Sequence, residues 1–215
     1  MNRHRNLDRL LQQGLIAVVR TDGTEHLEAL VTTLYGAGIE VIEITLTIPG
    51  ALKAVERLAD QWRGKILLGV GTVLDAMTAR MAINAGAEFI VSPTVDRGVI
   101  ETCHRYDVIS IPGGLTATEI LTAWDAGADI VKVFPADVMG PDYFAAVRRP
   151  LPQIRMMPTG GITLDAIPKF IAAGACAIGA GGTLVPADAV KNADWPRITE
   201  LAHAFRTKIA EARGV

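Results

Sequence analysis

One lysine of this chain, Lys132, lies in the middle of the apolar, β-prone run Ile130-Val131-Lys132-Val133-Phe134. The other lysines all fall outside the strands that the sequence predicts. Desolvation lowers the pKa of a buried lysine from about 10.4 towards the neutral amine that attacks a carbonyl. The position therefore suits Schiff-base chemistry, although a lysine whose stem lies along the core and whose head reaches water fits the same run.

A carboxylate, Glu43, interrupts a second apolar run, Glu40-Val41-Ile42-Glu43-Ile44-Thr45-Leu46. Because side chains alternate along a strand, Glu43 and Lys132 can both point to the inner side of a curled sheet. A carboxylate beside an imine can relay protons through water. Alternatively, Glu43 serves only as an ion-pair partner for Lys132 or Arg20.

Two glycine pairs, Gly160-Gly161 and Gly181-Gly182, follow two of the predicted strands. Paired glycines let backbone N–H groups close on an anion, and they are also ordinary devices for tight turns. Arg20 ends the first predicted strand, where it can bind a substrate carboxylate or phosphate, or form a structural ion pair. Together these residues predict a site for an anionic substrate.

The elements that must position these residues follow a repeating pattern, in which an Ala-Gly pair ends a helix and precedes an apolar run. Strands are predicted near residues 15–20, 39–46, 66–71, 88–92, 108–111, 129–134, 154–158 and 176–179. Helices are predicted at about 4–13, 24–36, 50–60, 75–85, 96–106, 116–126, 142–149, 163–173 and 195–212, the last capped by Asp194 with Pro196 in its first turn.

Eight alternating βα units predict a (β/α)8 TIM barrel with an N-terminal helix, and an open doubly wound sheet is the alternative. No linker or shift in composition divides the chain, so residues 1–215 are expected to form a single barrel domain. In such barrels, the active-site residues lie where the strands end and the following loops begin. The candidate residues lie at those ends.

Composition and residue spacing exclude several classes of function. Of the 215 residues, 50% are hydrophobic, and the net charge of −2 gives no general affinity for nucleic acid or acidic membranes. The N-terminal residues suit an amphipathic helix rather than a signal peptide, and no stretch approaches the roughly 20 apolar residues of a membrane span. With only Cys103 and Cys176, a cytoplasmic protein without a disulfide framework is expected. Neither metal-ligand spacing nor a nucleophile elbow is present, so no metal or cofactor is expected.

At this point the sequence resembles the KDPG/KHG aldolases, short class I aldolases that cleave 2-keto-3-deoxy-6-phosphogluconate. The resemblance runs in family order from about residue 15 to 186. The matching sequence motifs are Ile42-Glu43-Ile44-Thr45-Leu46, Gly69-Val70-Gly71-Thr72-Val73-Leu74, Ile90-Val91-Ser92-Pro93, Ile111-Pro112-Gly113, Val131-Lys132-Val133-Phe134-Pro135-Ala136 and Pro158-Thr159-Gly160-Gly161-Ile162.

The resemblance implies that Lys132 forms the Schiff base and that Glu43 is the general acid/base. It further implies a set of substrate-binding residues: Arg20 and Thr72 at the carboxylate, Pro93 and Phe134 around the imine, Thr159 at the substrate hydroxyl, and Gly160, Gly161, Gly181 and Gly182 around the phosphate. The family is a trimer without a metal cofactor, so a homotrimer acting on a small phosphorylated keto acid is implied here.

Two departures from the family bear on the substrate. Thr47 stands where many members have an arginine that contacts the keto acid, and Gly182 stands where members often have serine. The implied reaction cleaves KDPG to pyruvate and glyceraldehyde 3-phosphate. The galactonate-configured phosphate (KDPGal) and 4-hydroxy-2-oxoglutarate remain alternative substrates, and a sugar-phosphate isomerase or sensor on the same barrel remains an alternative function.

Overall fold

The computed structural model of the protein describes residues 3–214. All eight predicted strands are present, each within a few residues of its expected place. The strands are β1 (Leu15–Val19), β2 (Val41–Thr45), β3 (Leu67–Gly71), β4 (Phe89–Val91), β5 (Ile109–Ile111), β6 (Gly113–Gly114), β7 (Val131–Val133), β8 (Met156–Pro158) and β9 (Ile178–Ala180). The short β6 follows β5 after Pro112, which has no N–H to continue the ladder.

Except between β5 and β6, helices separate the strands; α1 covers one end of the strands, and the other helices lie outside them. They are α1 (Arg3–Gln13), α2 (Leu27–Gly36), α3 (Ala51–Gln61), α4 (Ala76–Asn84), α5 (Arg97–Arg105), α6 (Ala117–Asp125), α7 (Ala136–Arg148), α8 (Ile167–Ala172), α9 (Ala187–Lys191) and α10 (Trp195–Arg213). The cap predicted for α10 is confirmed, because the Asp194 side chain accepts a hydrogen bond from the Arg197 N–H at 3.2 Å.

Three helices differ from the sequence prediction. Helix α7 begins at Ala136 rather than near residue 142, because two helical pieces meet at a kink where Gly140 has a φ of 73° and Pro141 follows. Helix α8 has only 6 residues, shorter than predicted. Helix α9 was not predicted, since its 5 residues are too few to show a helical period.

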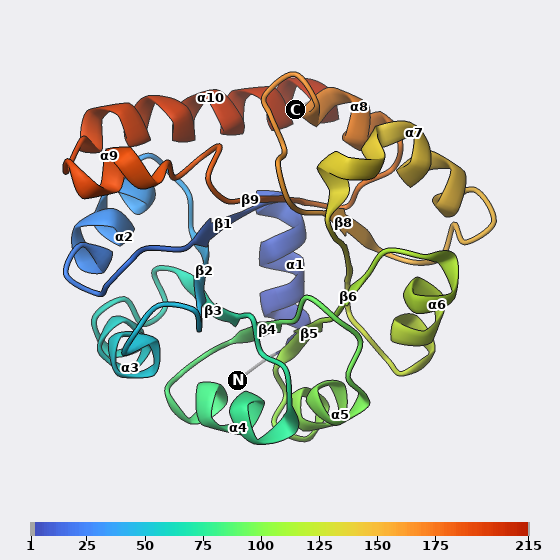
Figure 1. The fold of residues 1–215 in the computed structure, drawn as a ribbon, viewed down its shortest axis with the longest axis horizontal. Helices are drawn as coiled ribbons and strands as arrows, with labels where there is room; N and C mark the ends of the chain where they lie inside the picture. Colours follow the sequence, from blue (N-terminus) through green and yellow to red (C-terminus); the bar gives the residue numbers. More distant parts are fainter. Residues whose placement is uncertain (1–2, 215) are drawn as a thin grey trace.

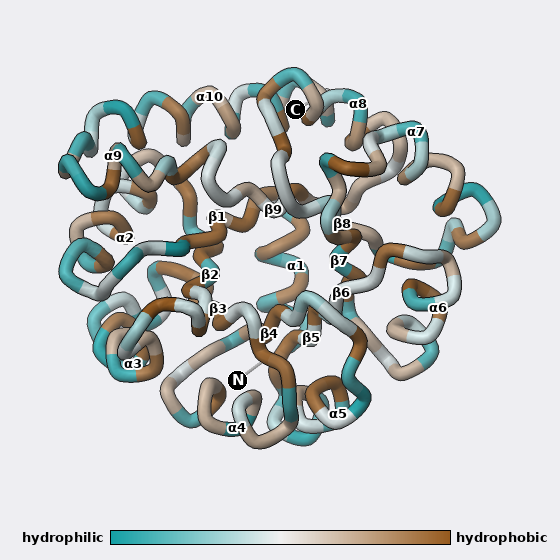
Figure 2. Tube along the Cα trace, in the orientation of Figure 1, coloured by the Kyte–Doolittle hydropathy of each residue, from teal (hydrophilic) through white to brown (hydrophobic). Residues whose placement is uncertain are grey.

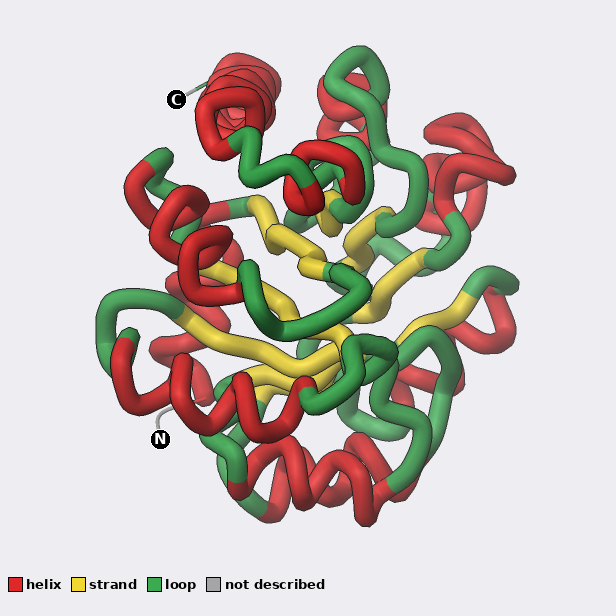
Figure 3. The backbone as a smooth tube through the Cα atoms, turned by 60° about the vertical axis from the view of Figure 1, so that its left-hand side comes forward, coloured by secondary structure: helices red, strands yellow, loops and turns green. Residues whose placement is uncertain are grey.

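All the strand pairs are parallel, and the order of the strands follows the chain. One six-stranded sheet has the order β5-β4-β3-β2-β1-β9, so the last strand lies beside the first, and a second sheet has the order β6-β7-β8. A bridge between Thr159 and Gly179 joins the second sheet to β9, and the Lys132 N–H donates to the Pro112 carbonyl at 2.9 Å. The result is an α/β fold whose parallel strands curl around a centre inside a layer of helices (Figures 1 and 3).

Apolar side chains fill two separate layers, in line with the alternation of side chains along each strand. On β1, Leu15, Ala17 and Val19 pack outwards under the helices, whereas Ile16 and Val18 belong to an inner cluster. The hydrophobic colour in Figure 2 follows the strands, while hydrophilic residues alternate along the surrounding helices and loops. Ile130 and Val41 both belong to the inner cluster, so their face-mates Lys132 and Glu43 also point inwards.

Helix α1 covers one end of the strands, where Figure 1 shows it behind the centre of the ring that the strands form. Its Leu7 and Leu10 join the inner apolar cluster. Its polar side chains reach residues that precede strands: Arg3 pairs with Asp129 at 3.1 Å, Asn6 donates to Glu88 at 3.1 Å, and Arg9 pairs with Glu40 at 2.7 Å. The amino-terminal ends of the strands are thereby covered, and the carboxyl ends remain available for a site.

Candidate active site

A cavity of about 340 Å³ opens among the carboxyl ends of the strands. It is lined by Val18, Arg20, Glu43, Lys132, Phe134, Thr159, Gly160, Gly161, Gly181, Gly182, Val185 and Ala187. Of the candidate residues from the sequence, all except Thr47, Thr72 and Pro93 lie on its wall. Strands β1, β2, β7, β8 and β9 or the loops after them supply these residues, so distant parts of the chain meet here.

Lys132 lies at the centre of β7, opposite Gly113 on one neighbouring strand and Met157 on the other. It is only 7% exposed, and its Nζ lies 4.7 Å from the centroid of the Phe134 ring. No carboxylate of residues 3–214 forms an ion pair with it. Burial therefore lowers the pKa of Lys132; the negative charge of Glu43 opposes this shift and the positive charge of Arg20 adds to it.

Glu43 projects from the middle of β2 and is 1% exposed. Its Oε2 is buried and has no hydrogen-bond partner among the described residues. The absence of a side chain at Gly71, on β3, leaves the space that the carboxylate fills. Burial raises the pKa of Glu43, although the nearby charges of Lys132 and Arg20 lower it in part.

The two groups have complementary proton chemistry. A buried amine whose pKa is lowered more readily exists as the neutral nucleophile, and a carboxyl group whose pKa is raised more readily holds a proton that it can give to a substrate. Within residues 3–214, neither group forms a close ion pair that would hold Lys132 as an ammonium. This arrangement supports attack of Lys132 on a carbonyl, with Glu43 as the proton carrier.

Thr159, just after β8, contributes a hydroxyl to the same wall. Its Oγ1 is buried and has no partner among the described residues, and Gly179 on β9 provides the room that it occupies. A buried hydroxyl without a hydrogen bond costs stability. Thr159 is therefore placed to meet a polar group of a ligand in the cavity.

The two glycine pairs also line the cavity. Gly160 and Gly161 have φ values of 98° and 60°, in the left-handed region that favours glycine. At Gly182 nothing would meet an added Cβ within 4 Å. The Thr183 hydroxyl donates to the Ile162 carbonyl at 2.7 Å and so ties the two glycine loops together. Close approach of a ligand to both backbones is therefore sterically possible.

The three remaining candidates follow β2, β3 and β4. The Thr45 hydroxyl donates to the Val19 carbonyl at 3.2 Å and lies 2.9 Å from Thr47 Oγ1. Because the single proton of Thr45 is used at Val19, Thr47 donates to Thr45 and keeps only lone pairs to offer a ligand. Thr72 has a φ of 62°, unusual for a residue with a side chain, and Pro93 lies against Gly113 through its carbonyl.

Sequence reasoning did not identify the apolar part of the wall. Val18 belongs to a strand that was predicted, but Val185 and Ala187 lie in a loop and in a short helix without a sequence signal. Thr183 was also missed, because its hydrogen bond depends on two loops that meet only in the folded chain. Among residues 3–214, no group of three or more His, Cys, Asp and Glu side chains is placed to hold a metal ion.

The family model for KDPG and KHG aldolases matches residues 7–201 of this chain. The chain belongs to the KDPG and KHG aldolase family. As a member of this family, the protein is a class I aldolase and therefore a lyase. None of the helices in residues 3–214 of this aldolase is long and apolar enough to cross a membrane.

Curated relatives of the aldolase are similar over most of their length. The 2-dehydro-3-deoxy-phosphogluconate aldolase of Treponema pallidum is 34% identical over 189 residues, 87% of this chain and 90% of that protein. The corresponding enzyme of Pseudomonas aeruginosa is 31% identical over 209 residues, 96% of this chain and 94% of that protein. The 2-dehydro-3-deoxy-6-phosphogalactonate aldolase of Escherichia coli is 33% identical over 171 residues, 79% of this chain and 83% of that protein.

Solved structures of the family superimpose closely on the aldolase. A native KDPGal structure gives a TM-score of 0.86 at 32% identity, over 94% of this chain and 96% of the other. KDPG aldolase from Legionella pneumophila gives 0.86 at 30% identity, over 93% of this chain and 97% of the other. In that structure, pyruvate was captured at low pH as a covalent carbinolamine intermediate.

Proposed function

We propose that the aldolase cleaves a 2-keto-3-deoxy-6-phospho sugar acid, KDPG, to pyruvate and glyceraldehyde 3-phosphate, with Lys132 as the Schiff-base nucleophile. The observation that carries this proposal is the buried Lys132 amine without an ion pair, in one cavity with the buried carboxyl of Glu43. Membership of a class I aldolase family supports it.

The proposed reaction begins when the neutral Lys132 amine attacks the C2 ketone. Glu43 protonates the resulting carbinolamine oxygen, which leaves as water and gives a protonated imine. The C4 hydroxyl then loses its proton to the Glu43 carboxylate as the C3–C4 bond breaks, and the bond electrons pass into the imine to form an enamine. Protonation of the enamine at C3 and hydrolysis of the imine release pyruvate and regenerate the amine.

Borohydride reduction tests this mechanism. With pyruvate present, reduction converts the imine to a stable secondary amine, and the added mass should appear on the peptide that contains Lys132. The Lys132→Arg variant should give neither the adduct nor pyruvate release, whereas Lys169→Arg, on helix α8, serves as the matched control and should give both. An adduct on another lysine would rule out this assignment.

The glycine loops after β8 and β9 support a phosphorylated substrate. Gly160 and Gly161 have left-handed conformations and bring backbone, rather than side chains, to the cavity wall, as phosphate sites after the last two strands of such barrels do. Arg20 on the same wall supplies a positive charge for the carboxylate end of the substrate. We expect 4-hydroxy-2-oxoglutarate, which lacks a phosphate, to give a much lower kcat/KM than the phosphorylated substrates.

The galactonate-configured phosphate, KDPGal, is a second candidate substrate. Thr47 supports it, because the related galactonate-type aldolases tend to have a neutral polar residue where many other members of the family have arginine. The similarity to the KDPGal aldolase of Escherichia coli also supports this candidate. Initial rates of pyruvate release from the two epimers, measured by coupling to lactate dehydrogenase, distinguish the two proposals.

We also propose that residues 1–215 form one closed (β/α)8 barrel domain. Three contacts support closure of the barrel. Strand β9 pairs with β1, the bridge from Thr159 to Gly179 joins the second sheet to β9, and the hydrogen bond from Lys132 to Pro112 joins its other side to the segment after β5. A single cooperative transition in thermal unfolding, seen by both circular dichroism and calorimetry, is expected for one domain.

A cytoplasmic location is part of the proposal, supported by the free thiols of Cys103 and Cys176.

A homotrimer is the proposed assembly. Two separate apolar patches support it: Leu74, Met77 and Met81 around helix α4, and Val138 and Met139 in helix α7. Met77 is 76% exposed, and a ring of identical subunits needs two different complementary surfaces on each copy. Light scattering after size exclusion should give a mass of about three chains, and Met77→Lys should reduce it.

A further inference from the structure

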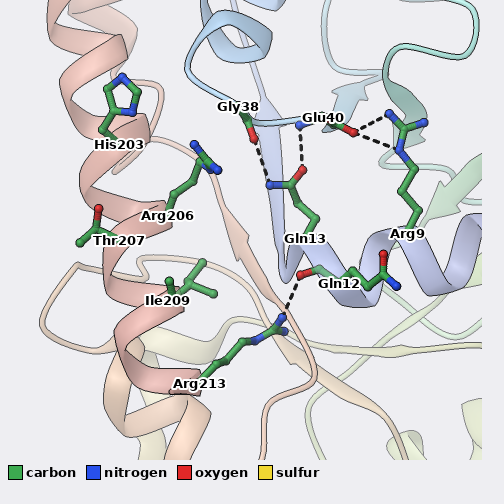
Figure 4. A pocket seen from close by; sticks show the side chains of 11 residues that line it. Arg9, Gln12, Gln13, Gly38, Glu40, His203, Arg206, Thr207, Ile209 and Arg213 are labelled. Atoms are coloured by element: carbon green, nitrogen blue, oxygen red, sulfur yellow. Dashed lines mark hydrogen bonds and ion pairs between the residues drawn. The ribbon is translucent and has the colours of Figure 1, made fainter. Parts of the chain in front are cut away.

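A hollow of about 500 Å³ lies at the end of the strands opposite the active-site cavity. Helix α1, helix α10 and the segment that leads into β2 enclose it, as Figure 4 shows. Its wall consists of Arg9, Gln12, Gln13, Gly38, Glu40, His203, Arg206, Thr207, Ile209, Ala210 and Arg213. None of these residues lines the active-site cavity, so the aldol reaction does not explain them.

Two arginines of helix α10 give the hollow an excess of positive charge. Arg206 Nη1 donates to the Ala37 carbonyl at 3.0 Å, and Arg213 Nη1 donates to the Leu11 carbonyl at 2.9 Å. Within residues 3–214, no carboxylate forms an ion pair with either guanidinium. Arg213 also donates from Nη1 to the Gln12 carbonyl at 3.2 Å and from Nη2 to the Cys176 carbonyl at 2.6 Å. These carbonyl groups satisfy some of the N–H donors but carry no net charge, so neither cation is neutralised by a carboxylate of residues 3–214.

The one carboxylate on the wall is already neutralised. Glu40 Oε2 lies 2.7 Å from Arg9 Nη2 and also accepts from Arg9 Nε at 3.2 Å. Gln13 fixes the same segment, since its Nε2 donates to the Gly38 carbonyl at 3.2 Å and its Oε1 accepts from the Glu40 N–H at 3.0 Å. The wall beside the arginines is therefore held in place without reducing their charge.

Most N–H groups of the Arg206 guanidinium donate to no other described residue. A guanidinium carries five N–H groups in a planar fork that matches carboxylate and phosphate oxygens. Among the described residues, only Nη1 of the Arg206 guanidinium has a hydrogen-bond partner, and Figure 4 shows the group extending from α10 towards the loop at Gly38. Partial burial lowers the pKa of Arg213.

We propose that this hollow binds a small polyanion, a metabolite carrying more than one carboxylate or phosphate group, through Arg206 and Arg213. Arg206 and Arg213 lie roughly two turns apart on α10, so the ligand would lie along this helix, beside α1. Because it would bind only the folded protein, it would raise the melting temperature as its concentration rises above the dissociation constant.

Isothermal titration calorimetry of the full-length enzyme at low ionic strength tests the proposal, with citrate as the polycarboxylate probe and pyrophosphate as the phosphate probe. We expect at least one of the two to bind, and the stronger one identifies the class of ligand. Arg206→Gln should weaken its affinity by about tenfold or more. Lys208→Gln, which removes one charge from the same helix outside the hollow, should leave the affinity unchanged.

A second variant and a second readout separate this site from the active site. Thr207→Glu, at an exposed position on the wall, should also weaken binding because it adds a carboxylate beside Arg206. Arg206→Gln should leave both pyruvate release and any competitive inhibition by pyrophosphate unchanged. Failure of both anions to bind the wild type, or equal binding by the wild type and Arg206→Gln, would overturn the proposal.

Discussion

The carboxylate of Glu43 occupies the space into which a side chain at Gly71 would project. Glu43 on β2 lies opposite Gly69 on β3, and Gly71 lies opposite Thr45, so the Glu43 side chain leans along the strand towards Gly71. An added Cβ on Gly71 would overlap the Glu43 carboxyl group. The position of the proton carrier thus depends on an absent side chain on the neighbouring strand.

Gly71→Ala is therefore expected to lower activity without removing any functional group. The new methyl group displaces the Glu43 carboxylate, and a shift of about 1 Å in a reacting group costs roughly 100-fold in rate. Steady-state kcat for pyruvate release, measured with whichever of KDPG and KDPGal the wild type cleaves faster, gives the effect. Gly36→Ala, on helix α2 with free space around it, is the matched control and should keep the wild-type rate.

Glu43→Gln keeps the shape of the side chain but removes its ability to carry a proton. Loss of a general acid/base lowers kcat by about 10²–10⁴-fold. Borohydride trapping with pyruvate should still label Lys132, but more slowly, because the nucleophile remains in place. An unchanged kcat would show that another group moves the protons.

The pH dependence of stability should reveal the buried amine. The folded-state pKa of Lys132 is lowered, so the unfolded chain binds more protons than the folded chain between that pKa and the ordinary value of 10.5. The contribution of Lys132 to the free energy of unfolding therefore rises with pH across that interval. Glu43 and Arg20 are the charged groups that modify the shift.

Lys132→Met measures this contribution. The variant should be more stable than the wild type at pH 7, and the difference should narrow by up to about 1.4 kcal/mol per pH unit as the pH rises towards 10.5. Chemical unfolding at a series of pH values provides the comparison. A difference that is constant over the interval would mean that Lys132 is not desolvated.

Thr47→Arg tests the choice between epimeric substrates. Arginine replaces an acceptor hydroxyl by a cation that reaches the keto acid end, so the ratio of kcat/KM for KDPG over KDPGal should rise by about tenfold. Thr32→Arg, at an exposed position on helix α2, adds the same charge away from the cavity and should leave the ratio unchanged.

Leu10→Ala tests the role of helix α1 as the cover of the strands. Leu10 is fully buried in the inner cluster, so the free energy of unfolding should fall by about 2–5 kcal/mol. Labelling of Lys132 at low temperature should persist, since the two residues lie at opposite ends of the strands. Asp8→Ala, on the exposed side of the same helix, should change stability little.

The sequence alone determined the order and type of nearly all the elements and the central pair of the site. Glycine at helix ends and continuous apolar runs are local signals, so the eight strands were placed within a few residues. The alternation of side chains put Lys132 and Glu43 on the inner face because the rule depends only on a period of two.

The tertiary structure alone decided which candidates share a cavity. Thr159, Gly161 and Gly182 meet Lys132 there, whereas Thr47, Thr72 and Pro93 lie outside its wall, because only the curvature of the sheet determines which strand ends converge. The same holds for the polar hollow between α1 and α10, whose Arg206 and Gly38 are far apart in the chain. Contacts between distant segments arise from packing of the whole chain, and no local pattern encodes them.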